Sequence, residues 1–333
     1  MRSAAPVLVV LAAFAATAAA RAPVASCPDD PALGSLRFVR AGHVHVVSLA
    51  ICVDVVAGRA PASRAQTPIV SPDGRFSATI RATGRGQTAR QTIWVTNLGI
   101  HRSHPVASET QYYKTIGPGD TAGPLWLFGF SPDDKWILFT VDPGSSASIA
   151  ADGTVLRVVA ARGGPVHKLG IALDYVDYHA WCGDRLVFTA GFDRVATNHK
   201  SLLVASPPSW RPRSLWPDPR ESFGSVTCAP DERSVAVEAQ HTSEDAGFFA
   251  PRWQLWRVGL DGSRRILDVP PPGTADESPQ WSPGGRWLLF VRERMGFGAV
   301  MLLHARSLYG PVANLGFSLG YYGHHDWPVR WTA

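Results

Sequence analysis

The sequence predicts an all-β protein, a six-bladed β-propeller closed by pairing of its C-terminal strand with its N-terminal blade. Two observations support this prediction. A tight turn followed by an apolar strand recurs along the chain at intervals of about 47 to 60 residues, which is the period of propeller blades. The chain also contains 27 prolines, 31 glycines and 12 tryptophans. That composition favours many short strands joined by turns over long helices.

The first element in chain order is a leader. Residues 1–20 combine an early arginine, Arg2, with an apolar stretch that ends in small residues. This is the pattern of a secretory signal peptide, so we expect cleavage after Ala20 and a short tail over residues 21–35. Two alternatives remain open, namely lipidation of Cys27 in "VASC" and an uncleaved membrane anchor. We expect no other membrane segment.

The recurring unit follows the tail, and it is a turn between two strands. In Ser-Pro-Asp-Gly, proline presets the second turn position, serine can bond the backbone, and glycine relieves the last position. The strand after the turn is nearly all apolar, as expected for a strand that is buried on both faces. The copies are "TPIVSPDGRFSATI" (Thr67–Ile80), "FGFSPDDKWILFTV" (Phe128–Val141), "YHAWCGDRLVFTAG" (Tyr178–Gly191), "VTCAPDERSVAVEA" (Val226–Ala239) and "SPQWSPGGRWLLFV" (Ser278–Val291).

Two further strands complete each predicted blade. A third strand follows a variable loop, as in Trp253–Leu260, and a polar turn leads to a short fourth strand, Arg264–Val269. The chain ends in "YYGHHDWPVRWTA", which resembles the first strand of a sixth blade, whereas the segment after the tail supplies three strands without a first one. We therefore expect the C-terminal strand to pair with Leu36–Arg40, giving one propeller domain over residues 36–333.

The repeat resembles that of the TolB-like six-bladed β-propellers, whose units carry a Trp-Ser-Pro-Asp-Gly core. The likeness covers nearly all of residues 36–333 and is clearest in Ser71-Pro-Asp-Gly, Ser131-Pro-Asp-Asp and Ser282-Pro-Gly-Gly. The resemblance implies an exported protein, secreted, periplasmic or at the cell surface, that binds a protein or a small ligand on one face of the disc. It says little about function, because the motif itself is turn and strand chemistry.

The predicted ligand site lies at one mouth of the central channel, which the first strand of each blade lines. Counting back from the turns places five side chains near this mouth. Carboxylates, imidazoles and an aromatic wall could form a polar pocket, although water in the channel could equally satisfy them. The candidates are Trp126, Asp177, His179, Glu277 and His325.

A metal site is a second prediction, because ring closure would bring two histidine pairs together. His43 and His45 alternate along one strand and so share a face. Closure would place them near His324 and Asp326, and imidazoles with a carboxylate can bind zinc or another transition metal. Exposed histidines at a blade rim are the alternative, and we expect no cofactor.

The chain has four cysteines, an even number that suggests two disulfides in an exported protein. Cys182 and Cys228 lie beside the turns of consecutive blades, which favours their pairing. Cys27 and Cys52 would then tie the tail to the first blade. No Cys-x-x-Cys spacing occurs, so we expect the cysteines to be structural.

Net charge and motif content limit the function classes. The chain has 32 basic and 27 acidic residues, a net charge of +5, and the basic residues are scattered. A nucleic-acid groove usually has clustered Lys and Arg, so we expect no nucleic-acid partner. The sequence predicts a monomeric, non-enzymatic binding scaffold for a protein or cell-envelope component. The alternative is a hydrolase or lyase with its active site at the channel mouth.

Overall fold

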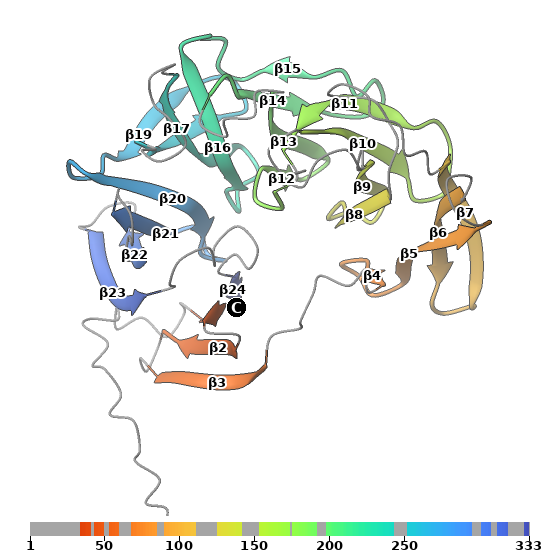
Figure 1. The fold of residues 1–333 in the computed structure, drawn as a ribbon, viewed down its shortest axis with the longest axis horizontal. Coiled ribbons are helices and arrows are strands. Elements are labelled where there is room, and N and C mark those ends of the chain that lie inside the picture. Colours follow the sequence, from red (N-terminus) through yellow and green to blue (C-terminus); the bar gives the residue numbers. More distant parts are fainter. Residues whose placement is uncertain are drawn as a thin grey trace, which may run out of the picture.

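The computed structural model describes residues 34–40, 43–49, 53–59, 68–84, 90–110, 125–141, 153–173, 175–191, 198–242, 252–294, 301–307, 312–318 and 330–332. The described strands form six separate four-stranded antiparallel sheets, and the prediction of an all-β protein is confirmed. The sheets follow one another in chain order around a common centre (Figure 1). The predicted leader, residues 1–20, lies outside the described residues.

In the described ranges, no helix is long and apolar enough to cross a membrane.

Sheet A contains strands from both ends of the chain. Its order is β24-β1-β2-β3, and β24 pairs antiparallel with β1 so that Trp331 lies opposite Leu36. β24 therefore occupies the edge position that the first strand of each other sheet occupies. The strands of sheet A are β24 (Arg330–Thr332), β1 (Ser35–Arg40), β2 (His43–Ser48) and β3 (Val53–Arg59).

The other five sheets are simple meanders, in which each strand pairs with the next one along the chain. Sheet B contains β4 (Ile69–Val70), β5 (Phe76–Thr83), β6 (Arg90–Asn97) and β7 (Arg102–Thr110); sheet C contains β8 (Leu125–Phe130), β9 (Trp136–Val141), β10 (Thr154–Ala160) and β11 (His167–Ala172). Sheet D contains β12 (His179–Cys182), β13 (Arg185–Ala190), β14 (Ser201–Ala205) and β15 (Arg213–Ser214). Sheet E contains β16 (Glu221–Cys228), β17 (Ser234–His241), β18 (Gln254–Gly259) and β19 (Arg264–Asp268); sheet F contains β20 (Thr274–Trp281), β21 (Trp287–Arg294), β22 (Met301–Ser307) and β23 (Val312–Ser318).

The recurring turn joins the first and second strands of a sheet, as its sequence predicts. A serine hydroxyl accepts a hydrogen bond from the backbone N–H five residues further on, which closes the turn with side-chain chemistry. The fourth residue of the turn has a positive φ, of 73° at Gly74 and 68° at Gly285, and glycine adopts this conformation without strain. The serine bonds are Phe76 N to Ser71 Oγ (2.9 Å), Trp136 N to Ser131 Oγ (3.0 Å) and Trp287 N to Ser282 Oγ (3.0 Å).

The hydrophobic core lies between the faces of neighbouring sheets. Residues 137–141 of β9 and 234–240 of β17 are all buried, so these second strands are covered on both faces, as their apolar sequences predict. Between sheets D and E, Val187 and Val204 belong to the same packed cluster as Phe223 and Val237. This face-to-face packing fixes where the inner end of each first strand lies.

A disulfide joins the first strands of sheets D and E. Cys182 ends β12 and Cys228 ends β16, and their sulfurs are bonded at 2.04 Å across a sequence separation of 46 residues. This is the pairing that the sequence analysis predicts. Cys27 and Cys52, the other predicted pair, lie outside the described residues.

Removing this disulfide tests its contribution to stability. Because it closes a long loop, the double variant Cys182→Ala/Cys228→Ala is expected to lose about 2–4 kcal/mol of free energy of unfolding. Urea denaturation followed by tryptophan fluorescence measures this loss. A change smaller than about 0.5 kcal/mol would show that the bond contributes little.

Candidate functional site

Two first strands carry a β-bulge at corresponding places. The register of β16 shifts between Phe223 and Val226, and that of β20 shifts between Glu277 and Gln280. A bulge removes residues from the ladder and redirects their backbone groups. Here the bulges free the N–H groups of Ser225 and Ser278, and both N–H groups donate to the same side chain.

That side chain is Glu238, in the middle of β17. Its carboxyl Oε2 accepts a hydrogen bond from the N–H of Ser225 at 3.0 Å, and Oε1 accepts one from the N–H of Ser278. Glu238 is 1 % exposed. Gly224 makes room for it, because a Cβ at that position would lie 2.1 Å from Glu238 Oε2. Glu238 therefore links sheet E to sheet F through buried hydrogen bonds.

Asp177 makes a second link at the same end of the sheets. It lies in the turn before β12, and its Oδ2 accepts hydrogen bonds from the hydroxyls of Ser225 at 2.8 Å and Ser278 at 3.3 Å. The backbone carbonyl of Asp177 also accepts a bond from the N–H of Val226 at 2.7 Å. Sheets D, E and F thus meet at the carboxyl groups of Asp177 and Glu238. Together with Glu277, whose charge acts on Glu238, we call them the carboxylate cluster.

Burial and neighbouring charges govern the protonation of Glu238. Burial raises the pKa of Glu238 to about 8, and the charges of Glu277 and Asp177 add to that rise, whereas the N–H groups of Ser278 and Ser225 oppose it. The buried phenol of Tyr178 responds to the same field. Its pKa is raised well above the usual value, first by burial and then by the charge of Glu238 and of Asp177. Glu238 and Tyr178 therefore keep their protons at neutral pH.

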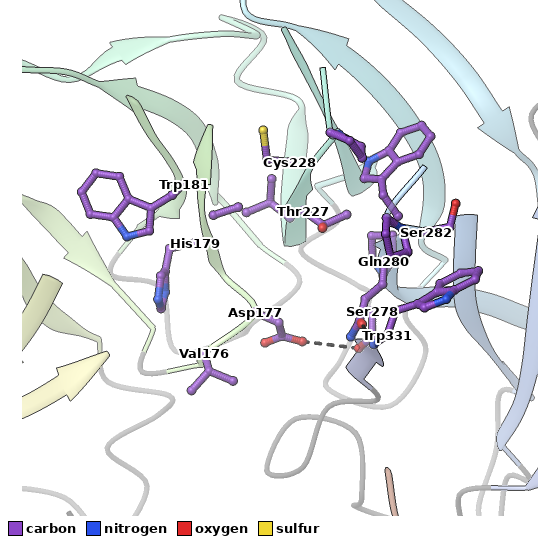
Figure 2. A pocket seen from close by; sticks show the side chains of 16 residues that line it. Val176, Asp177, His179, Trp181, Thr227, Cys228, Ser278, Gln280, Ser282 and Trp331 are labelled. Atoms are coloured by element: carbon purple, nitrogen blue, oxygen red, sulfur yellow. Dashed lines mark hydrogen bonds between the residues drawn. The ribbon is translucent and has the colours of Figure 1, made fainter. Parts of the chain in front are cut away.

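A pocket of about 440 Å³ opens beside the carboxylate cluster. Figure 2 shows His179 and Trp181 on one side and Gln280, Ser282 and Trp331 on the other, with Asp177 between them. Sheets D, E and F all contribute to it, and β24 adds Trp331. The remaining lining residues are Val176, Ala180, Val226, Thr227, Cys228, Pro230, Ser278, Pro279, Trp281 and Pro283.

The C-terminal strand is held against this pocket by a side chain of sheet F. Gln280 accepts a hydrogen bond from the backbone N–H of Trp331 through Oε1 at 3.1 Å. Phe128 of sheet C packs edge-on against His179, with ring centroids 4.4 Å apart. The pocket thus has a carboxylate, an imidazole and tryptophan walls, a combination typical of small-ligand sites.

The structure brings together some of the predicted ligand residues. Asp177 and His179 both line the pocket. Glu277 precedes the lining residue Ser278 and is itself buried at 4 % exposure. Trp126 lies on β8 in sheet C and does not line this pocket, and His325 lies outside the described residues.

The predicted metal ligands are placed only in part. His43 begins β2 and is exposed, whereas His45 on the same strand is 6 % exposed. His324 and Asp326 lie outside the described residues. Within the described ranges, no group of three or more His, Cys, Asp or Glu side chains is arranged to hold a metal ion.

Two residues that shape the site, Glu238 and Trp331, are not among those that the sequence predicts. Glu238 carries one signal that could have identified it, because it is the only charged residue within the apolar run "SVAVEA" of a strand predicted to be buried on both faces. Trp331 carries no comparable signal, since its place in the pocket depends on the register between β24 and β1.

Comparisons with known proteins add similarities at the level of structure. No family model matches the chain, and a search of curated proteins gives no match. A TolB-type structure from Agrobacterium tumefaciens is 17% identical with a TM-score of 0.49, covering 90% of this chain and 98% of that chain. TolB from Acinetobacter baumannii is 16% identical with a TM-score of 0.48, covering 90% of this chain and 66% of that one. Both are TolB proteins, the family whose repeat the sequence resembles.

A further solved structure is an enzyme. Oligogalacturonate lyase from Vibrio parahaemolyticus is 9% identical with a TM-score of 0.44, and the match covers 82% of this chain and 70% of that chain. At these identities the similarities concern the arrangement of strands and not the function.

Proposed function

We propose that the chain is a non-enzymatic binding scaffold whose ligand, a protein segment or a cell-envelope component, enters the pocket between sheets D, E and F. The observation that carries this proposal is the pocket itself, about 440 Å³ in volume and lined by tryptophans beside a carboxylate. Its walls come from three sheets that hydrogen bonds hold together, so it is formed before a ligand arrives. Such preorganisation favours binding, because little ordering entropy is lost.

The six sheets are, in this proposal, the blades of a propeller that β24 closes into a ring. The position of β24 supports it, because this strand stands in sheet A where β4, β8, β12, β16 and β20 stand in theirs. Without β24, sheet A would have three strands and its edge strand β1 would be unpaired on one side. Trp331 would then be placed in the pocket by the same pairing that completes the ring.

The proposed location is outside the cytoplasm. The Cys182–Cys228 bond supports it, because disulfides persist mainly in secreted, periplasmic and surface proteins. The apolar leader over residues 1–20 agrees with export.

The hydrolase or lyase alternative has less support from the geometry. A general acid or base must reach the reacting group of its substrate. Glu238, whose raised pKa suits an acid, is 1 % exposed, and backbone N–H groups occupy both of its oxygens. The carboxyl Oδ2 of Asp177 is likewise occupied by two serine hydroxyls.

Filling the pocket tests the scaffold proposal. Thr227 lines the pocket from β16 and is partly exposed, so Thr227→Trp should block the pocket without opening the core. We expect envelope components captured by the wild-type protein in a pull-down to fall at least about tenfold with this variant, because the blocked volume excludes the ligand.

A matched control carries the same substitution elsewhere. Thr110 ends β7 in sheet B and is exposed, so Thr110→Trp should leave the capture unchanged. Equal capture by the wild type and Thr227→Trp would show that binding does not use this pocket. Turnover of a captured glycan or peptide by the wild type would favour the enzyme alternative.

A further inference from the structure

The pocket presents an uncharged surface to a ligand, although a carboxylate lies in its wall. The Oδ2 of Asp177 accepts hydrogen bonds from two serine hydroxyls, and its Oδ1 is buried. None of the lining residues that the structure describes is Lys or Arg. Within this lining, a cation has no exposed carboxylate to bind. An anion has no basic partner there, and it is repelled by the charges of Asp177 and Glu277 that also act on Glu238. The lining therefore suits a neutral ligand.

Three consecutive residues of sheet F bring hydrogen-bond donors to this pocket, namely Gln280, Trp281 and Ser282. Gln280 accepts from the backbone N–H of Trp331 through Oε1, so its amide N–H groups remain for another acceptor. Trp281 is 7 % exposed, and in the described part of the chain its Nε1 has no hydrogen-bond partner. A buried donor without a partner is costly, so an oxygen atom that enters the pocket gains a bond there.

The third donor, the hydroxyl of Ser282, departs from the pattern of the other turns. The hydroxyls of Ser71 and Ser131 donate to the aspartate two residues further on, at 2.7 and 2.6 Å. Gly284 occupies that position in Ser282-Pro-Gly-Gly, so this turn has no carboxylate for its serine to bond. The Oγ of Ser282 accepts from the N–H of Trp287, as in the other turns, and its own proton is directed elsewhere. The change to glycine thus supplies a hydroxyl donor where the turn lines the pocket.

Aromatic rings flank these donors. Trp181 and Trp331 lie on opposite sides of the pocket in Figure 2, and both are partly buried. The face of an indole ring is electron-rich and packs well against weakly positive C–H groups. Trp281 does not serve in this way, because the guanidinium of Arg257 lies 5.7 Å from its ring centroid. The two opposed indoles suit a flat ring that has C–H groups on its faces and oxygen atoms around its edge.

Sugars and proline-rich peptides are both neutral ligands with apolar rings and oxygen acceptors. In a polyproline helix, carbonyl groups that point to the same side are about 9 Å apart, because the helix has three residues per turn. A sugar ring carries oxygen atoms on neighbouring carbons, so it can accept from several closely spaced donors. The donors of Gln280, Trp281 and Ser282 come from consecutive residues, and they therefore favour a sugar.

We propose that the pocket between Trp181 and Trp331 binds a neutral sugar ring. This inference rests on the proposed binding function and names the chemical class of the ligand. The sugar ring packs between the two indoles, and its oxygen atoms accept from the three donors of sheet F. Thr227 on β16 adds a hydroxyl from sheet E.

Neutral and charged trisaccharides test this selection. The neutral probes are maltotriose, cellotriose and N-acetylchitotriose; the charged probes are trigalacturonate and the de-acetylated chitosan trimer, which shares the backbone of N-acetylchitotriose. Isothermal calorimetry of the wild-type protein at pH 6 should show binding of at least one neutral probe. Both charged probes should bind at least about tenfold more weakly, because their charges lack a partner in the pocket.

The same titrations include acetyl-pentaproline-amide as a neutral peptide. Binding of no neutral trisaccharide, or binding of a charged one that is equal or tighter, would overturn the inference. Tighter binding of the peptide than of every sugar would overturn it in favour of a proline-rich ligand.

Removal of one wall locates the bound sugar. Trp331→Ala should weaken binding of the best trisaccharide at least about tenfold, because one of the two packing faces is lost. Trp94→Ala removes a partly buried tryptophan of β6 in sheet B, outside the pocket, and should leave binding unchanged. Circular dichroism checks that both variants fold. Unchanged binding by Trp331→Ala, or equal weakening by both variants, would contradict the proposed site.

A smaller change keeps the test independent of the β24 pairing. Thr227→Val preserves the shape of the side chain and removes its hydroxyl, so binding should weaken about three- to tenfold. Thr110→Val makes the same change at the exposed end of β7 and should have no effect. Equal binding by the wild type and Thr227→Val would show that the sugar does not contact this wall.

The two proposals can fail separately. Envelope capture that Thr227→Trp abolishes, together with binding of no neutral trisaccharide, would leave the scaffold proposal standing and overturn the sugar inference. Trisaccharide binding that Trp331→Ala weakens, together with capture that Thr227→Trp leaves unchanged, would support the sugar site and contradict the scaffold proposal.

Discussion

Replacing Arg292 with methionine is expected to lower the free energy of unfolding by about 3–5 kcal/mol at pH 8. Arg292 on β21 bonds both oxygens of Asp276, through Nε at 2.6 Å and Nη2 at 2.8 Å, and also bonds Asp268 at the end of β19. The Asp276 side chain is 0 % exposed. Arg292→Met would leave this carboxylate buried without its partner, and this loss is what destabilises the fold. Thermal and urea denaturation followed by circular dichroism measure it.

The pH dependence of the same variant provides a second readout. Burial raises the pKa of Asp276, and the guanidinium of Arg292 opposes that rise. Without Arg292 the folded-state pKa rises further above the unfolded value, so the loss of stability should grow as pH increases and shrink toward pH 5. Arg265→Met, an exposed control on β19, should change stability by less than about 0.5 kcal/mol. A loss below about 1 kcal/mol at pH 8 for Arg292→Met would contradict this account.

Glu238→Gln is expected to flatten the dependence of stability on pH. The folded pKa of Glu238, about 8, lies above its unfolded value of 4.5, so the folded state keeps a proton that the unfolded state has released. Stability from this group is therefore fully present below pH 4.5 and is lost as pH rises to about 8, by about 1.4 kcal/mol per pH unit. Glutamine does not titrate, so the variant should lose this slope. Urea denaturation at a series of pH values measures it.

The absolute stability of this variant is a separate quantity. A glutamine amide cannot accept from both Ser225 and Ser278, so one N–H stays unsatisfied, at a cost of about 1–3 kcal/mol at low pH. Wild type and Glu238→Gln are therefore compared by the change of their unfolding free energy with pH. Glu232→Gln, at an exposed turn residue after Ala229, should keep the wild-type slope. A wild-type slope in Glu238→Gln would place the titration on another group.

The strands were predictable because local chemistry determines them. Ser71-Pro-Asp-Gly encodes its own turn, through the serine hydroxyl bond and the positive φ of Gly74. The apolar strands after each turn must be buried, and residues 137–141 of β9 are. The Cys182–Cys228 pairing followed from the same periodicity, since both cysteines lie beside the turns of consecutive repeats.

The site was predictable only where it follows that periodicity. Asp177 and His179 hold repeat positions at the inner end of a blade, and both line the pocket. Glu238 lies on β17, the second strand of its sheet. A residue's position in the repeat predicts that such a strand is buried, but it does not predict which residues lie near a ligand. Its hydrogen bonds depend on two bulges, at Phe223–Val226 and Glu277–Gln280. No local sequence pattern in these strands predicts the bulges. An alignment of the repeats does not predict such contacts between strands of different sheets.

The pairing of β24 with β1 has a consequence for biosynthesis. This pairing helps to place Trp331 in the pocket, and Trp331 follows the strands of sheets B to F along the chain. A nascent chain that has already assembled sheets B to F still lacks one wall of the cavity. Capture of the ligand is therefore deferred until β24 has been synthesised, so products that terminate before β24 should bind the ligand more weakly even when most of their sheets have folded.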